Sequence, residues 1–351
     1  MSGGITQLVA IGAQDAHLVG TPEVSFFQSV YKRHTNFSHV VDRQVIQGNV
    51  SNNGTSTVRF ERRGDLLGYV YLAPSDGTQS LPVNNWSTCI ERVELLIGGQ
   101  VIDDQSAVFS QRIAPDLFAQ NYSKSPASGF YKSENGTNDV FFYPLRFFFC
   151  ENWQSALPLV ALQYHEVEIR ITWGSQAING PITTWECFSD FIYLDTQERK
   201  FFADNEHMLL TYQVQKATAS GTRVQELNFN HPVKFLASYD SSTTSPLVKP
   251  DVKIKLQVNG NDVSDFKYAK PHFTHVPSFY HTSHATKEDK RFIMPFCLET
   301  SKFQPTGSLN FSRLDSARIL TDGDLHTDDV YAVNFNILKI SNGMGGLLYA
   351  N

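Results

Sequence analysis

Hydrophobic and polar residues alternate along much of the chain, which is the pattern of strands that bury one face. Residues 166–173 and 252–258 show it most clearly, since every second side chain is apolar. Further strands are predicted at Phe60 and at residues 69–72, 93–97, 141–149, 209–214 and 330–340. Many short strands, separated by Gly, Asn and Pro, predict an all-β sandwich or barrel.

One segment near the start, residues 21–33, has a helical pattern instead. Thr21 can cap a helix, Pro22 suits its first position, and Glu23 suits the positive end of the helix dipole. Apolar residues then recur on one face, and basic residues follow where the negative end would lie. The pattern predicts one short N-terminal helix.

The two halves of the chain share a hairpin motif. Residues 93–97 run into Gly98-Gly99, and residues 254–258 run into Asn259-Gly260 in the same way. Two-residue turns of these types need positive φ and typically join paired strands. Downstream, an aromatic run, a loop with proline and an alternating strand follow in the same order in both halves, at nearly the same separation. The sequence therefore predicts an internal duplication.

The repeat places the boundary between its two units near residues 195–199. We predict three parts, namely an N-terminal arm at 1–25, a first jelly roll at 26–197 and a second jelly roll at 198–351. Each of the two larger parts has the size of one eight-stranded jelly roll. Two long inserts, at 103–139 and 266–291, interrupt the repeat. We expect both to be surface loops that carry variable functions.

Several strings of residues resemble the major capsid proteins of nucleocytoplasmic large DNA viruses. The longest are ALPLVALQYHEV at 156–167 and QPTGSLNFSRLD at 304–315, and PLRFFF at 144–149 precedes the first of them. Shorter matches lie at residues 63–67, 97–103, 194–199, 330–336 and 342–347. Together these segments extend over nearly the whole chain.

The resemblance implies a double jelly roll, that is, an all-β chain of two consecutive eight-stranded antiparallel jelly rolls. It also implies a structural protein of the virion, made in the host cytoplasm, that is not an enzyme and needs no cofactor. Three chains would form a homotrimer whose six jelly rolls make a pseudo-hexagonal capsomer of an icosahedral shell. Its partners would be neighbouring capsomers and minor capsid proteins. An internal viral membrane would lie nearby without being spanned, and the chain would not bind nucleic acid directly.

Charge and cysteine content are compatible with this assignment. The formal net charge is −6 and no long basic run occurs, so a tail that wraps nucleic acid is not expected. The four cysteines form no CxxC pair, so neither a zinc ribbon nor a redox pair is expected. The sequence has neither a signal-peptide pattern nor an apolar stretch of ~18–20 residues, which predicts synthesis in a reducing cytosol with free thiols.

Four histidines lie close together in the second half, at His272, His275, His281 and His284. A zinc site needs neutral imidazoles that converge at about 2.0–2.1 Å from the ion. Two prolines in the segment predict a loop, in which this spacing would not bring the rings together. We therefore expect surface histidines rather than a metal site.

Two further motifs resemble metal sites but are incomplete. His326-Thr327-Asp328 has two elements of a 2-His-1-carboxylate iron centre, yet no histidine follows it in the chain. Asp322-Gly323-Asp324 lacks the spaced Glu of a calcium loop and is predicted to form a turn.

No residue has the sequence context of a catalytic nucleophile, since GxSxG and GxxxxGK[ST] motifs are absent. His165 shares strand parity with Val167, so we expect a buried, hydrogen-bonded histidine rather than a base. Arg63-Gly64-Asp65 lies where a strand turns between apolar residues, and we do not expect it to serve in adhesion. We predict no catalytic, cofactor-binding or metal-binding residue.

Glycosylation and two alternative functions stay open. Seven Asn-x-Ser/Thr triplets occur, at Asn36, Asn49, Asn53, Asn85, Asn121, Asn135 and Asn310. The aromatic content of 13% leaves a carbohydrate-binding jelly-roll protein as a rival hypothesis. An exposed row of coplanar rings would favour that rival, whereas rings inside the sandwiches would favour the structural function. A minor capsid relative is the second alternative.

Overall fold

The computed structural model describes residues 3–10, 12–19, 27–29, 31–83, 85–126, 140–241, 245–287 and 289–349. The chain forms two compact units, residues 1–36 and 37–351. The N-terminal unit contains helices α1 (Gly3–Val9) and α2 (Asp15–Leu18), and neither helix has a buried side chain.

The helix predicted at residues 21–33 is not found in the part of it that the structure describes. Residues 27–29 and 31–33 are not helical, while residues 21–26 and 30 lie outside the described residues. Phe27 and Tyr31, from the predicted apolar face, are almost fully exposed. A short amphipathic helix gains most of its stability by burying that face, and these two rings have no such burial.

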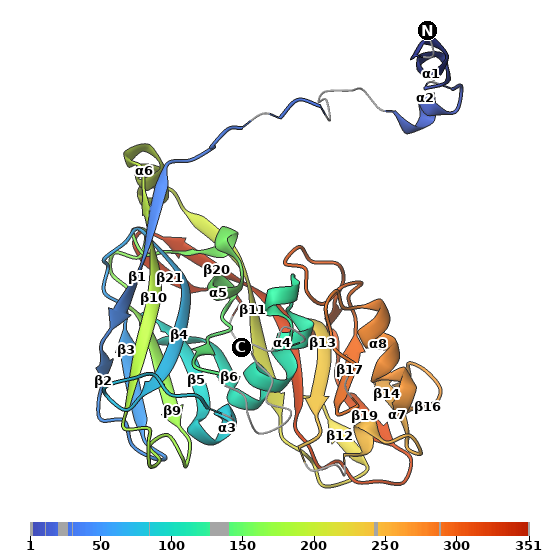
Figure 1. Ribbon diagram of the computed structural model, residues 1–351. Helices are drawn as coiled ribbons and strands as arrows, with labels where there is room; N and C mark the ends of the chain where they lie inside the picture. Colours follow the sequence, from blue (N-terminus) through green and yellow to red (C-terminus); the bar gives the residue numbers. More distant parts are fainter. Residues whose placement is uncertain are drawn as a thin grey trace. The chain divides into compact units, whose positions relative to one another are not determined.

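Strands from residues 37–194 form two antiparallel sheets, drawn in blue to green in Figure 1. Sheet I has the order β1 (Phe37–Gln44), β10 (Thr184–Leu194), β4 (Leu66–Ser75) and β7 (Tyr143–Pro144), and β8 (Leu157–Pro158) also pairs with β4. Sheet II has the order β2 (Ile46–Gln47), β3 (Thr55–Arg59), β9 (Val167–Trp173), β5 (Ile90–Ile97) and β6 (Gln100–Ser106).

Strands from residues 207–347 form two further antiparallel sheets. Sheet III has the order β11 (His207–Ala217), β20 (Val330–Ser341), β13 (Pro232–Tyr239) and β17 (Arg291–Pro295), with β18 (Leu309–Asn310) on β13 and β21 (Met344–Leu347) on β20. Sheet IV has the order β12 (Val224–Glu226), β19 (Ala317–Thr321), β14 (Lys253–Val258) and β15 (Asn261–Asp262), with β16 (Lys267–Tyr268) on β14.

The two pairs of sheets repeat one topology. Sheets I and III each have their first strand at one edge, followed by the last long strand and then a central strand that also pairs with a two-residue strand. Sheets II and IV each end in a hairpin, β5–β6 or β14–β15. The predicted duplication and the predicted double jelly roll are both confirmed.

Short helices connect the strands. They are α3 (Trp86–Cys89), α4 (Ala114–Leu117), α5 (Phe148–Glu151), α6 (Thr196–Asp204), α7 (Ala269–His272) and α8 (His275–Tyr280), together with a π-helical turn at Phe109–Ile113 and 3-10 turns at Tyr122–Lys124, Trp153–Ser155, Pro246–Val248 and Phe311–Arg313. Helix α6 joins the two jelly rolls and begins after Asp195, whose carboxylate accepts a hydrogen bond from Thr196 N.

Both predicted hairpin turns are confirmed. Gly98 and Gly99 have φ of +58° and +82°, and Asn259 and Gly260 have φ of +49° and +79°. Paired positive φ values of this kind match the right-handed twist of the flanking strands. Gly98 also lies against the His165 ring, where an added Cβ would come within 2.5 Å of the imidazole.

The strand predicted at residues 141–149 is mostly wrong. Only Tyr143–Pro144 pairs as a strand, and Phe148–Glu151 forms helix α5. Pro144 has no N–H with which to continue the ladder. The rings of Phe147, Phe148 and Phe149 are all buried, which a helical turn beneath the sheets allows.

Candidate functional site

The two jelly rolls meet in a junction of buried side chains. Strand β13 buries six consecutive residues, 233–238, so both faces of sheet III are covered. Phe235 and Ala237 belong to the hydrophobic cluster of the first jelly roll, whereas Leu236 belongs to the cluster of the second. Side chains that alternate along one strand therefore enter two different cores, and the two jelly rolls form one packed block.

Aromatic residues from the first insert cover the outer face of sheet III. Phe118 contacts Tyr212 and Phe235 with ring centroids 5.1 and 6.1 Å apart, and Phe109 contacts Tyr331 at 5.7 Å. Helix α4 lies between Phe109 and Phe118 in the sequence. Figure 1 shows this helix between the strands of the two halves. Residues 107–119 of the first insert are mostly buried and are therefore not a surface loop, contrary to expectation. Residues 120–123 are exposed, and residues 127–139 lie outside the described residues.

A buried ion pair joins the two inserts. Asp116 on α4 pairs with Arg291 at the start of β17, and both side chains are almost fully buried. Thr286 donates to Asp116 Oδ1 twice, from its backbone N at 2.7 Å and from Oγ1 at 2.9 Å. Hydrogen bonds to a paired carboxylate reduce the cost of burying both charges.

A second buried carboxylate, that of Asp103 on β6, bonds directly to a strand of the other jelly roll. Its Oδ1 accepts from Val214 N on β11 at 2.9 Å, and its Oδ2 accepts from Gln105 Nε2 at 2.7 Å. Burial raises the pKa of Asp103 to about 7, and these hydrogen bonds oppose the rise. Gln213 Nε2 donates to Ile102 O at 2.5 Å and extends the contact along β6.

A third contact brings the C-terminal hairpin against the first jelly roll. Tyr164 N donates to Gly343 O at 2.9 Å, and His165 Nδ1 lies 2.9 Å from Gly345 O. His165 is half-buried and hydrogen-bonded, in line with the sequence-based expectation of a satisfied histidine.

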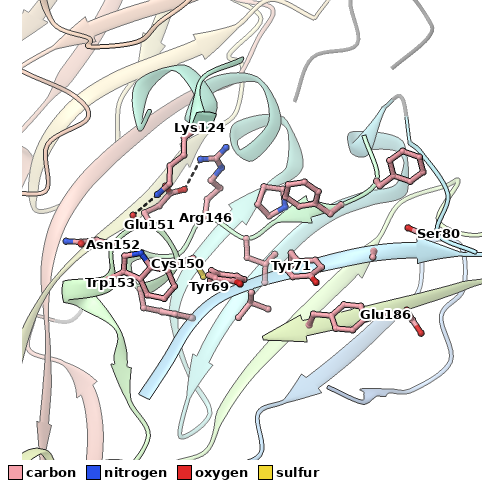
Figure 2. A pocket seen from close by; sticks show the side chains of 18 residues that line it. Tyr69, Tyr71, Ser80, Lys124, Arg146, Cys150, Glu151, Asn152, Trp153 and Glu186 are labelled. Atoms are coloured by element: carbon pink, nitrogen blue, oxygen red, sulfur yellow. Dashed lines mark hydrogen bonds and ion pairs between the residues drawn. The ribbon is translucent and has the colours of Figure 1, made fainter. Parts of the chain in front are cut away.

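An aromatic pocket of about 640 Å³ lies on the outer face of sheet I (Figure 2). The rings of Tyr69, Tyr71 and Phe188 are nearly parallel, with angles of 25° between the first two and 21° between the last two. Phe142 and Trp153 stand edge-on to this row. All three rings of the row are half-buried, so they meet only in part the condition set for carbohydrate binding.

One end of the pocket carries charged groups. Arg146 and Glu151 form a buried pair at 2.8 Å, and Lys124 Nζ donates to Glu151 O at 3.0 Å, as the dashed lines in Figure 2 show. Because the Glu151 carboxylate pairs with Arg146 and also lies 3.7 Å from Lys124 Nζ, this arrangement favours a structural role over acid–base chemistry. Partial burial raises the pKa of Tyr69 and of Tyr71, so both hydroxyls stay protonated at neutral pH.

The histidine segment contains helices α7 and α8 rather than a plain loop, which corrects the prediction. His275 Nε2 pairs with Asp289 at 2.5 Å, and His281 Nδ1 lies 3.0 Å from Cys297 O. Within the described ranges, no group of three or more His, Cys, Asp or Glu side chains is arranged to hold a metal ion.

The histidine and acidic residues of the two incomplete metal motifs are buried or bonded to neighbouring residues of the fold. His326 is buried, and burial lowers its pKa to about 4. Asp328 accepts from Ser241 Oγ at 3.0 Å, and Asp324 pairs with Lys249 at 2.5 Å.

The tripeptide at residues 63–65 is tied into the first jelly roll. Asp65 is buried, where it accepts from Leu194 N at 2.9 Å and pairs with Arg199 at 3.0 Å. The six described asparagines of the Asn-x-Ser/Thr triplets are exposed, and Asn135 lies outside the described residues.

The residues that join the jelly rolls were not singled out by sequence reasoning. Asp116 is an isolated charge in an apolar stretch, whereas Asp103 adjoins Asp104 and Arg291 ends the charged run at residues 287–291. The isolated charge of Asp116 within the apolar residues 113–119 is the one signal that could have drawn attention to the junction.

Comparisons with known proteins follow the same division of the chain. A family model described as "Major capsid protein N-terminus" matches residues 25–195, and one described as "Large eukaryotic DNA virus major capsid protein" matches residues 198–346. The major capsid protein of Pyramimonas orientalis virus is 34% identical, over all of both chains. The chain belongs to the major capsid proteins of large eukaryotic DNA viruses. The predicted family, the structural function in the capsid and the location in the virion are thereby confirmed.

Further relatives support the assignment to the major capsid proteins. The major capsid protein of Paramecium bursaria Chlorella virus 1 is 31% identical over the full length of both chains. The crystal structure of PBCV-1 VP54, fitted into a reconstruction of the virophage Sputnik, has a TM-score of 0.78 at 28% identity, and the match covers 93% of this chain and 100% of that chain. A quasi-atomic model of the PBCV-1 capsid has a TM-score of 0.76 at 27% identity, with the same coverage. None of the helices that the structure describes has the length and apolar character of a membrane span.

Proposed function

We propose that three copies of this major capsid protein form a homotrimeric, pseudo-hexagonal capsomer. The observation that supports this is the junction, which fixes two jelly rolls of equal topology in one rigid block. Three such blocks around a threefold axis present six similar units, so the trimer fits a hexagonal lattice. Each chain divides into an arm at 1–25 and jelly rolls at 26–197 and 198–351.

The partners of the capsomer are neighbouring capsomers and minor capsid proteins. Contacts between capsomers are individually modest and strong in sum, because each capsomer touches several neighbours at once. An internal viral membrane lies nearby and is not spanned, and the chain makes no direct contact with nucleic acid. The chain acts as a structural unit without catalysis, since its buried carboxylates at Asp116 and Glu151 serve in ion pairs.

Size-exclusion chromatography with light scattering of the full-length protein tests the trimer. The expected result is a stable mass of three chains at micromolar concentration, with particles of sixfold outline in negative-stain electron microscopy. A monomer at that concentration would contradict the proposal.

A further inference from the structure

The junction inside one chain provides a template for contact between chains, because the two jelly rolls can be matched residue by residue. Leu67 on β4 pairs with Leu157 on β8, and Val233 on β13 pairs with Leu309 on β18. The short strands β8 and β18 occupy the same place in their sheets, so Leu67 corresponds to Val233.

This register assigns counterparts to the aromatic pocket. Two positions further along, Tyr69 on β4 corresponds to Phe235 on β13. On the neighbouring strands, Phe188 pairs with Tyr71 while Tyr331 pairs with Ala237, so Phe188 corresponds to Tyr331. Within the chain, the first insert covers Phe235 and Tyr331 through Phe118 and Phe109. The two matching residues of sheet I, Tyr69 and Phe188, line the pocket of Figure 2.

The edge strands show the same contrast between a covered and an uncovered position. Arg43 pairs with Phe188 on β10 as Lys216 pairs with Tyr331 on β20, so Val41 corresponds to Val214. Val214 is 8% exposed beneath Asp103, whereas Val41 is 37% exposed. Sheet I thus carries the same kind of apolar surface as sheet III without the cover that sheet III has from the first insert.

The second insert is the counterpart of the first, since it follows β15 as the first insert follows β6. It has the opposite character, because most of its large apolar side chains are exposed and Phe273 alone among them is buried. Phe279 and Tyr280 on α8 are 78% and 72% exposed and lie edge-to-face with ring centroids 4.9 Å apart. Phe266, Tyr268 and Val276 of the same insert are exposed as well, and so is Val263 shortly before it.

We propose that the second insert of one copy covers sheet I of the next copy, with Phe279 and Tyr280 entering the pocket beside Tyr69, Tyr71 and Phe188. The contact repeats between chains the packing that the first insert makes within the chain. It is a head-to-tail contact between unlike surfaces, which closes into a ring when its rotation matches the threefold axis. This inference rests on the proposed trimer and names its interface.

Two measurements on the full-length protein test the contact. In the first, light scattering follows dissociation of Phe279→Ser/Tyr280→Ser and of Tyr71→Lys on dilution. Each variant is expected to raise the concentration of half-dissociation at least about tenfold, because central aromatic residues dominate interface energies. Leu325→Ser is the matched control, since Leu325 is 53% exposed on a loop outside both surfaces. Circular dichroism of the dissociated variants establishes that they fold.

In the second measurement, chains with Phe279→Cys are mixed with chains with Tyr71→Cys and oxidised. A disulfide between the two kinds of chain is expected, whereas mixing Leu325→Cys with Tyr71→Cys gives none. If the protein is a trimer but the variants dissociate like the control and the cysteines do not cross-link, the interface is wrong and the proposed trimer stands. If the unmodified protein is a monomer, both proposals fail. Binding of an oligosaccharide to Tyr71 in the intact trimer would show an open pocket and would overturn the interface.

Discussion

Val214 N donates a hydrogen bond of 2.9 Å to the carboxylate of Asp103, and the two residues belong to different jelly rolls. Burial raises the pKa of Asp103 to about 7, above the ordinary value of 3.8. Between pH 3.8 and pH 7 the Asp103 carboxyl is protonated in the folded chain and ionised in the unfolded chain. The contribution of Asp103 to stability is therefore complete below about pH 4 and is lost as the pH rises through 7.

We predict that Asp103→Asn removes this pH dependence. The asparagine Oδ1 still accepts from Val214 N, and the neutral side chain does not titrate. Urea unfolding from pH 5 to 8 is expected to show a decline in stability for the unmodified protein, on the order of 4 kcal/mol over the full titration, that is absent from the variant. Equal slopes in the two proteins would contradict the assignment to Asp103.

His326 is predicted to act in the opposite direction. Its pKa falls to about 4 in the fold against an ordinary value of 6.5, mainly through burial. The unfolded chain binds the extra proton between these values, so stability is lost as the pH falls from 6.5 through 4. The thermal midpoint of the unmodified protein is expected to fall between pH 7 and pH 4.5. In His326→Phe this fall should be smaller, because phenylalanine takes up no proton. A variant that keeps the full loss in acid would refute this role.

Asp116→Ala is predicted to destabilise the protein by about 3–5 kcal/mol, since it removes one member of a buried ion pair and leaves the charge of Arg291 less compensated. Glu206→Ala is the control, because the pair of Glu206 with Lys339 at 3.4 Å is largely exposed. Pairs of that kind contribute less than about 1 kcal/mol. Denaturant unfolding measures the free energy of unfolding of both variants. Similar losses in the two would show that the buried pair contributes no more to stability than the exposed pair.

Comparing Gly98→Ala with Gly99→Ala separates the cost of a positive φ from the cost of contact with the His165 ring. Both positions have positive φ, which costs an alanine about 1–2 kcal/mol. Only at Gly98 would the new Cβ also meet the His165 ring, since nothing lies within 4 Å of a Cβ at Gly99. Gly98→Ala should therefore be the more destabilising in thermal unfolding, and His165→Ala should reduce the difference. Equal effects of the two glycine variants would mean that the ring moves aside freely.

The sequence predicted the strands best where one face is buried and the other is wet. The alternation at 167–173 became β9, whose burial alternates along all seven residues. The turns at Gly98-Gly99 and Asn259-Gly260 were predictable because so few residue pairs tolerate two positive φ values. Local patterns of this kind need no knowledge of distant contacts.

The junction was less predictable because its partners are far apart in the sequence. Residues 233–238 are buried on both faces, a state that alternation cannot reveal, and the segment containing Phe109 and Phe118 resembled a loop by composition. The aromatic pocket likewise combines β4, β10 and residues 141–153 on both sides of α5. Only the tertiary pairing shows that Tyr69 and Phe235 occupy matching positions.

The shared core of the junction has a consequence for how the polypeptide is made. Phe235 and Tyr331 are covered by residues of the first jelly roll, all of which leave the ribosome earlier. Domains generally fold in the order of their synthesis. The first-insert residues that cover sheet III are therefore folded when the second jelly roll emerges. A chain shortened at its beginning would expose the apolar outer face of sheet III during translation.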